Sequence, residues 1–522
     1  MIQKPARPVP GLLHQERGPM ADHALRRIGD GDNVGEREAA HRDLRREVLQ
    51  ATFWSTVGLW SNRGLTFVFL AVLARRLGPQ AFGLVALSSV YIGFLLVFQD
   101  QGFGHAVIQR KDLQADHLNT VFWMNVVLAL VLTLAIVWGA PWIGRVLREP
   151  QLPGVMRGLS PLLLIGAFAS AHRALLYRTF RFRSLAVAGI VGVTAGGIVG
   201  IWAARRGMGV WSLVFYQLVN RTSESCLIWW QSDWRPRFRW TRSHFQDMFG
   251  FGKYVVVGQL AAFAHLYAAN LIIGFFLGPI AVGLFDVASR GIRMILQMIS
   301  GVISHVSLPT FARLQQEPER GRTVYLQATS QVALLSFPVF FAIAVLAPEI
   351  VATVFGAQWD RVIPAMRVLS LAGIAQSVCY LKRYLVLAYG RPKWHLQLEL
   401  LTVVLTLTGV LLTVREGIVA VAWAYVLAQL ASFPPLFLAV SRLVHIRFKE
   451  DLRVLLPAWT SSLLATVTIF LLKPIMVGYL APAAVLVTDL LVGAGIYLAG
   501  VWLINPNDLI TTLRHLRVRP VC

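Results

Sequence analysis

Four polar residues at helical spacing lie inside an apolar run of the chain and could bind an anion. Asp286, Arg290, Arg293 and Gln297 follow one another at steps of four, three and four residues, which places them on one face of a helix. A guanidinium group can bind two oxygen atoms of a phosphate at once. The pattern therefore predicts either a cavity lined with fixed cations or a structural pair between Asp286 and Arg290.

Other ionisable residues also fall inside apolar runs. Placing a charged side chain in the middle of the bilayer costs at least about 2.5–3.5 kcal/mol, so each of these residues is a functional candidate by default. Arg63 has no acidic residue one helical turn away, which favours a role in a cavity. Arg221 and Glu224 are three residues apart, and they either neutralise each other or serve a site. The cation candidates for substrate binding are Arg63, Arg221, Arg290 and Arg293, and the candidates for coupling to protons or sodium are Asp100, Glu224, Asp286 and Glu399.

The composition shows that these residues must be positioned by membrane-spanning helices. Of the 522 residues, 56% are hydrophobic and 14% are charged, whereas soluble domains carry about 25% charged residues. The stretch 118–138 has no charge and is long enough to cross about 30 Å of hydrocarbon. Fourteen spans are predicted, near 51–74, 79–99, 118–138, 158–176, 184–204, 207–230, 253–277, 279–306, 325–347, 363–389, 393–413, 417–440, 454–472 and 481–504.

The distribution of basic residues predicts the orientation of the chain. Lys and Arg outside the spans are more numerous on one side, and the positive-inside rule assigns that side to the cytoplasm. Both termini are then cytoplasmic. The predicted parts are a disordered or loosely helical tail (1–48), an N-lobe of six spans (51–230), a cytoplasmic linker (231–252), a C-lobe of six spans (253–440), two further spans (454–504) and a C-terminal segment (505–522).

A short phrase occurs twice and points to a duplication. Residues 77–84 read LGPQAFGL and residues 277–284 read LGPIAVGL, and each copy joins the first span of a lobe to the second. Gly78 and Gly278 are expected to end a helix with positive φ, and Pro79 and Pro279 suit the first turn of the next helix. A hairpin of this kind could also arise without duplication, but the shared place in both lobes predicts parallel repeats.

Two site classes are not supported by the sequence. The net charge of +23 comes from short loops such as RTFRFR (178–183) and RPRFRW (235–240). Arginine interleaved with aromatic residues can bind nucleic acid, but at the edge of a span topology and anionic headgroups explain it better. The three cysteines have no metal-type spacing. We therefore expect no nucleic-acid partner, no metal site and no cofactor.

Three stretches resemble a known family. The sequences FQDQGFGHAVIQRKDLQADHLNTVFWMN (98–125), HRALLYRTFRFRSLA (172–186) and GMGVWSLVFYQLV (207–219) look like the polysaccharide-flippase branch of the multidrug/oligosaccharidyl-lipid/polysaccharide exporter superfamily. The resemblance covers roughly residues 50–445. It implies an all-α membrane protein of two six-helix lobes around a central cavity, with two extra helices.

The resemblance also implies a function, which is transport rather than catalysis. Such proteins flip a lipid-linked oligosaccharide across the bacterial inner membrane for lipopolysaccharide, capsule or exopolysaccharide assembly. The expected partners are that substrate, bilayer lipids and a polysaccharide polymerase or export machinery, with the protein itself a monomer. The alternatives are an ion-coupled multidrug exporter of the same superfamily and a membrane polysaccharide polymerase or ligase. The first should need more carboxylates in the N-lobe, and the second a larger outer loop carrying catalytic residues.

Overall fold

A computed structural model describes residues 34–100, 115–238, 242–477 and 481–504, without the side chains of some helical residues such as 34–49 and 242–259. The described part consists of helices and the segments that connect them, and contains no strand. Twelve of its helices are long and apolar enough to cross a membrane. The all-α polytopic class expected from the sequence is therefore confirmed, while the total of fourteen spans stays a prediction.

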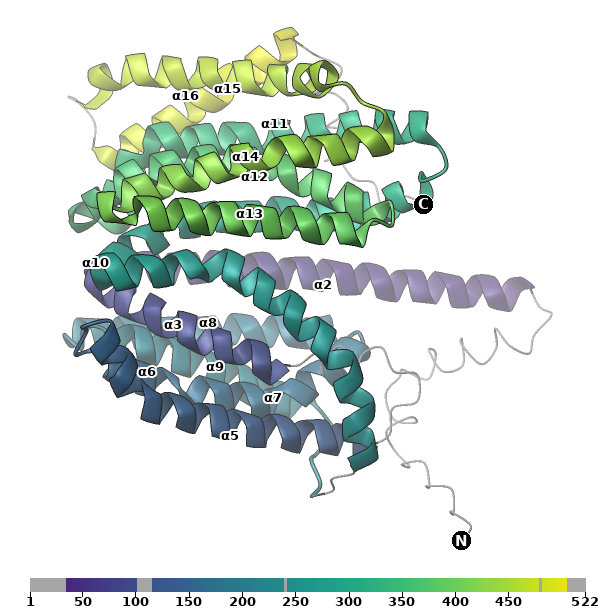
Figure 1. The fold of residues 1–522 in the computed structure, drawn as a ribbon, viewed down its shortest axis with the longest axis vertical. Helices are drawn as coiled ribbons and strands as arrows, with labels where there is room; N and C mark the ends of the chain where they lie inside the picture. Colours follow the sequence, from purple (N-terminus) through teal and green to yellow (C-terminus); the bar gives the residue numbers. More distant parts are fainter. Residues whose placement is uncertain (1–33, 101–114, 239–241, 478–480, 505–522) are drawn as a thin grey trace. The chain divides into compact units, whose positions relative to one another are not determined.

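The chain divides into two compact units, of which the first comprises residues 1–77 and 87–263. Its helix α8 packs against both α2 and α9, and α7 packs against α5 and α9. Figure 1 shows these helices in purple to blue. The helices of this unit are α2 (Val34–Ala74), most of α3 (Pro79–Asp100), α5 (Ala115–Val146), α6 (Leu152–Leu159), α7 (Pro161–Arg178), α8 (Phe182–Arg205), α9 (Trp211–Gln231) and the beginning of α10 (Arg242–Arg313).

The second unit comprises residues 78–86 and 264–522. Helix α12 packs against α11 and α14, and the last two helices, α15 and α16, lie beside α11 (Figure 1). Besides the remainder of α10, its elements are α11 (Pro318–Ile350), η1 (Val351–Phe355), η2 (Ala357–Val362), α12 (Ile363–Ala388), α13 (Pro392–Thr413), η3 (Val414–Glu416), α14 (Ile418–Val444), α15 (Phe448–Val477) and α16 (Pro482–Ile504).

Two features differ from those expected. Residues 34–48, expected to be disordered or loosely helical, form the first turns of α2, because Ala, Glu, Arg and Leu favour helix. Helix α9, the expected sixth span, is not among the twelve candidate spans of the described residues, since it carries Asn220, Arg221 and Glu224. The expected break between the seventh and eighth spans is present, because the backbone of α10 is non-helical at Gly278.

The two copies of the repeated phrase end their helices differently. Gly278 has φ 78°, as predicted, whereas the expectation of a positive φ at Gly78 is wrong. Helix α2 already ends at Ala74, and the amide of Leu77 donates to the carbonyl of Leu73 in a closing turn. The chain has therefore left its helical path before it reaches Gly78, and Pro79 begins α3.

The same two phrases contact each other within the second unit. A Cβ atom added at Gly83 would lie 1.7 Å from the carbonyl oxygen of Pro279, and one added at Gly283 would lie 2.0 Å from that of Pro79. The contact is reciprocal, as expected of two related segments that cross. Only glycine permits backbones to approach this closely.

The glycines of α8 allow close helix packing. A Cβ atom at Gly196 would lie 2.5 Å from the carbonyl oxygen of Tyr216 on α9, and one at Gly197 would lie 2.2 Å from the Phe69 ring on α2. Helix α8 thus packs closely against both α2 and α9. These two helices carry Arg63 and Glu224, so the packing holds both residues in place within the first unit.

Candidate functional site

The polar stripe on α10 forms a compact ion cluster in the second unit. The carboxylate of Asp286 is buried and accepts from both arginines: Arg290 Nη2 lies 2.6 Å from Oδ2, and Arg293 Nη2 lies 2.8 Å from Oδ1. Arg293 also donates to the hydroxyl of Ser289. The side chains of Arg290 and Arg293 are 44% and 29% exposed within the structure. One carboxylate therefore holds two guanidinium groups, both of which remain partly exposed.

A pocket of about 70 Å³ adjoins this cluster, enough for several water molecules or a small polar group. Arg293 contributes a charge to its wall, and two tyrosines from other helices contribute aromatic faces. Such a mixture of apolar surface and a few polar groups is typical of a ligand site. The lining comprises Phe285, Ser289, Ile292, Arg293, Leu296, Gln297, Leu369, Ala372, Gln376, Tyr380 and Tyr425.

The first unit contains a cluster of the same charge composition. The carboxylate of Glu224 on α9 accepts from Arg221 Nη1 at 2.9 Å and from Arg173 Nη2 on α7 at 2.8 Å. All three side chains are 20–35% exposed within the structure. The sequence identified Arg221 and Glu224 as a pair but missed Arg173, which lies 51 residues from Glu224. Two arginines again share one carboxylate.

Arg63 lies on α2 in the first unit, within the span Phe53–Ala74. Its Nη1 atom is buried and has no hydrogen-bond partner among the residues that the structure describes. A buried guanidinium nitrogen without an acceptor is costly, so an anionic ligand would stabilise it. The neighbouring Asn62 packs against Gly189 of α8, which fixes this turn of α2.

The other coupling candidates have different surroundings. Glu399 on α13 is paired with Arg383 of α12 at 2.6 Å, and Arg383 also donates to the hydroxyl of Thr402 at 3.1 Å. Glu224 and Asp286 hold the arginines described above. The side chain of Asp100 lies outside the described residues.

Sequence analysis missed two ion pairs in the second unit because their members are far apart along the chain. Lys382 on α12 and Asp451 on α15 are almost fully buried and lie 2.8 Å apart. Lys473 on α15 and Glu349 on α11 also lie 2.8 Å apart. Helical spacing reveals only partners three or four residues away, so it indicates neither pair, although Lys382 itself stands out as a charge inside the expected span 363–389.

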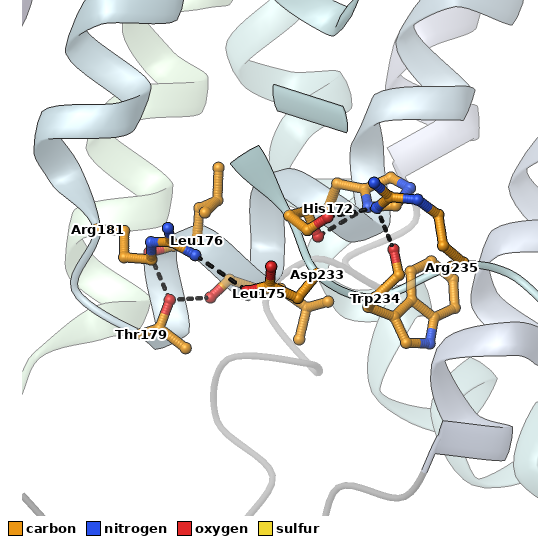
Figure 2. A network of polar contacts seen from close by, with 9 residues as sticks. His172, Leu175, Leu176, Thr179, Arg181, Asp233, Trp234 and Arg235 are labelled. Atoms are coloured by element: carbon orange, nitrogen blue, oxygen red, sulfur yellow. Dashed lines mark hydrogen bonds and ion pairs between the residues drawn. The ribbon is translucent and has the colours of Figure 1, made fainter. Parts of the chain in front are cut away.

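The two basic loops of the first unit are held to the end of α7 (Figure 2). Arg181 lies 3.4 Å from the carboxylate of Asp233, and His172 Nδ1 lies 3.0 Å from the hydroxyl of Ser232. Arg235 donates to the backbone carbonyl of Trp234 at 2.9 Å. These contacts hold residues 232–235 against the end of α7. Contact of the arginines in the two basic loops with lipid headgroups stays a prediction.

Comparisons with known proteins agree with this architecture. The family model for polysaccharide biosynthesis proteins matches residues 72–364. Lipopolysaccharide biosynthesis protein WzxC of Escherichia coli is 25% identical over 337 residues, which is 64% of this chain and 68% of that protein. Teichuronic acid biosynthesis protein TuaB of Bacillus subtilis is 24% identical over 394 residues, 75% of this chain and 81% of that protein.

A solved structure shares the fold. The lipid II flippase MurJ aligns with a TM-score of 0.69 over 89% of this chain and 99% of that chain, at 12% sequence identity. At this identity the likeness concerns the fold alone. The family model, however, spans more than half of the sequence, so the chain belongs to the polysaccharide biosynthesis protein family.

Proposed function

We propose that this protein flips a lipid-linked oligosaccharide, carried on a polyprenyl pyrophosphate, across the bacterial inner membrane during polysaccharide assembly. The observation that carries the proposal is a partly exposed arginine pair in each unit: Glu224 holds two arginines in the first, and Asp286 holds two in the second. Membership of the polysaccharide biosynthesis family and the fold shared with a lipid II flippase support the same class of substrate.

The chemistry of the substrate explains why arginine is needed. A pyrophosphate carries negative charge that must cross a low-dielectric slab, and fixed guanidinium groups lower that barrier. The arginines of both clusters are 25–44% exposed and can approach an anionic head group. Arg63 adds a buried guanidinium nitrogen that lacks an acceptor. The lipid chain stays in the bilayer while the head group is held by these arginines.

Movement of the substrate follows the alternating-access scheme of secondary transporters, in which two lobes rock around a site near the membrane midplane. In this proposal the lobes are residues 51–230 and 253–440, with both termini in the cytoplasm. The pocket beside Asp286 is lined in part by polar residues such as Gln376 and Ser289. These can form hydrogen bonds with the hydroxyl groups of a sugar, which an apolar drug lacks.

Deletion of the gene tests the function in cells. A polyprenyl-pyrophosphate-linked oligosaccharide should accumulate on the cytoplasmic leaflet, and one surface polysaccharide should be lost. Normal export of every surface polysaccharide together with new drug sensitivity would instead support a multidrug exporter.

Substitution of Arg63 by alanine should lower polysaccharide export at least about tenfold at a normal level of protein, because a hydrogen bond to a charged group is worth about 1.5–3 kcal/mol. Arg63→Lys keeps the charge without the two-pronged geometry and should retain part of the export. Arg206→Ala, at an exposed position at the end of α8, serves as the control. Export is measured per unit of membrane-inserted protein, and loss of that protein in Arg63→Ala would point to a structural role.

A further inference from the structure

Helix α16, the last that the structure describes, contains a buried carboxylate that no described cation neutralises by a hydrogen bond. Asp489 lies on α16 and is 1% exposed, and its Oδ2 atom has no hydrogen-bond partner among the described residues. The coupling candidates Glu224, Asp286 and Glu399, by contrast, each hold at least one arginine. Asp489 is therefore the least compensated of these carboxylates.

Two charged groups interact with Asp489 electrostatically, Glu349 of α11 and Lys473 of α15. The elements packed against α16 are α15, α11 and η1, and η1 contains no titratable residue. The remaining ionisable side chains of α11 and α15 fall in the first third of each helix, far from this end. Asp489 thus belongs to a three-residue group with two carboxylates and one ammonium.

The ammonium of Lys473 is already fully used by other acceptors. It lies 2.8 Å from Oε1 and 2.9 Å from Oε2 of Glu349, and it donates to the carbonyl oxygen of Val345 at 3.4 Å. An ammonium group has three N–H donors. None of them is left for Asp489, so its ionised form would bring a second negative charge into the group without a donor.

The surroundings make that second charge costly. Val345, Leu346 and Ile469 form an apolar cluster with Leu486 packed against it, within one or two turns of the three charged residues. An unpaired carboxylate in such surroundings is expelled or neutralised. The described residues include no group of three or more metal-binding side chains, and the ammonium repels a metal cation. A proton, unlike a metal cation, needs no further ligands to neutralise a carboxylate at such a position.

We propose that Asp489 is a proton-binding site, and that its proton decides whether Lys473 is held by Glu349 alone or is shared between both carboxylates. Release of the proton leaves two carboxylates competing for one ammonium, which changes the contacts joining α11, α15 and α16. In the proposed transport function, on which this last role rests, Asp489 carries the proton that couples transport to the proton gradient.

Infrared difference spectroscopy of the purified full-length protein at stepped pH tests the site without a transport assay. Wild-type protein should show a protonated carboxylic acid band at neutral pH that disappears at higher pH. Asp489→Asn, which keeps the shape of the protonated group, should lack the band. Asp360→Asn, at an exposed aspartate of the same unit, should retain it. Absence of the band from wild type, or its persistence in Asp489→Asn, would overturn the proposal.

A second variant tests the sharing of Lys473. Glu349→Gln removes the competing carboxylate, so Lys473 should pair with Asp489, which then ionises and loses the band at neutral pH. An unchanged band in Glu349→Gln would contradict the sharing. In cells, Asp489→Asn should lower export at least about tenfold at equal protein level. Unchanged export in Asp489→Asn would refute the coupling role. If the protein proved not to be a flippase, the infrared test of the proton-binding site would still hold.

Discussion

Replacing Lys382 by methionine is expected to lower the free energy of unfolding by about 3–5 kcal/mol, the usual cost of removing one partner of a buried ion pair. The Lys382 side chain is 0% exposed, and its ammonium lies 2.8 and 3.0 Å from the two carboxylate oxygens of Asp451. The Tyr325 hydroxyl donates to the same carboxylate at 2.7 Å. The variant leaves Asp451 charged without its ammonium at the contact of α11, α12 and α15.

A matched control lies close by on two of the same helices. Arg322 of α11 and Glu450 of α15 are 2.7 Å apart, but each is about one-third exposed. Arg322→Met should therefore cost no more than about 1 kcal/mol. The double variant Lys382→Met, Asp451→Leu removes both charges and should regain most of the lost stability. Unfolding is followed by tryptophan fluorescence in detergent, and equal effects of Lys382→Met and Arg322→Met would contradict the burial argument.

Substitution of Gly83 by alanine is expected to destabilise the protein by at least about 1–3 kcal/mol, the usual cost of overpacking. The added Cβ atom would lie 1.7 Å from the carbonyl oxygen of Pro279 and 3.0 Å from the amide nitrogen of Gly283. Both are backbone atoms that cannot turn away as a side chain would, so α3 and α10 must separate. The yield of folded protein and its unfolding temperature measure the effect.

The contact between the two repeated phrases is reciprocal, which provides a second variant, and another glycine of α10 provides a control. Gly283→Ala should act like Gly83→Ala, because its Cβ atom would lie 2.0 Å from the carbonyl oxygen of Pro79. Gly291, also on α10, has no atom within 4 Å of an added Cβ atom. Gly291→Ala should be neutral or stabilising, since alanine favours helix over glycine by about 1 kcal/mol. A loss of stability in Gly291→Ala as large as in Gly83→Ala would rule out the crossing as the cause.

The sequence predicted the features that depend on local spacing. Apolar runs located the helices, and the steps between Asp286, Arg290 and Arg293 placed these residues in one cluster, which the structure contains. The repeated phrase predicted the left-handed conformation of Gly278. It failed for Gly78 because the turn after Ala74 ends α2 before the glycine is reached, a difference that the shared letters of the two copies do not encode.

Partners that are distant in sequence could not be predicted from one chain. Lys382 and Asp451 are 69 residues apart, and Arg173 and Glu224 are 51 residues apart. Helical periodicity says which face of a helix a residue occupies, but it does not say which helix packs against that face. Asp489, in contrast, lies inside the expected span 481–504 and could have been identified from the sequence, because an ionisable residue in an apolar span is a functional candidate by default.

Transbilayer movement of the substrate in reconstituted vesicles tests the central claim most directly. The purified protein is inserted into liposomes that contain a labelled polyprenyl-pyrophosphate-linked oligosaccharide, and a membrane-impermeant reagent measures how much of it becomes accessible from outside. We predict that accessibility rises with time in vesicles that contain the protein, and much less in those that contain Arg63→Ala. The same slow rise in protein-containing and protein-free vesicles, with an imposed proton gradient of either direction, would contradict the account.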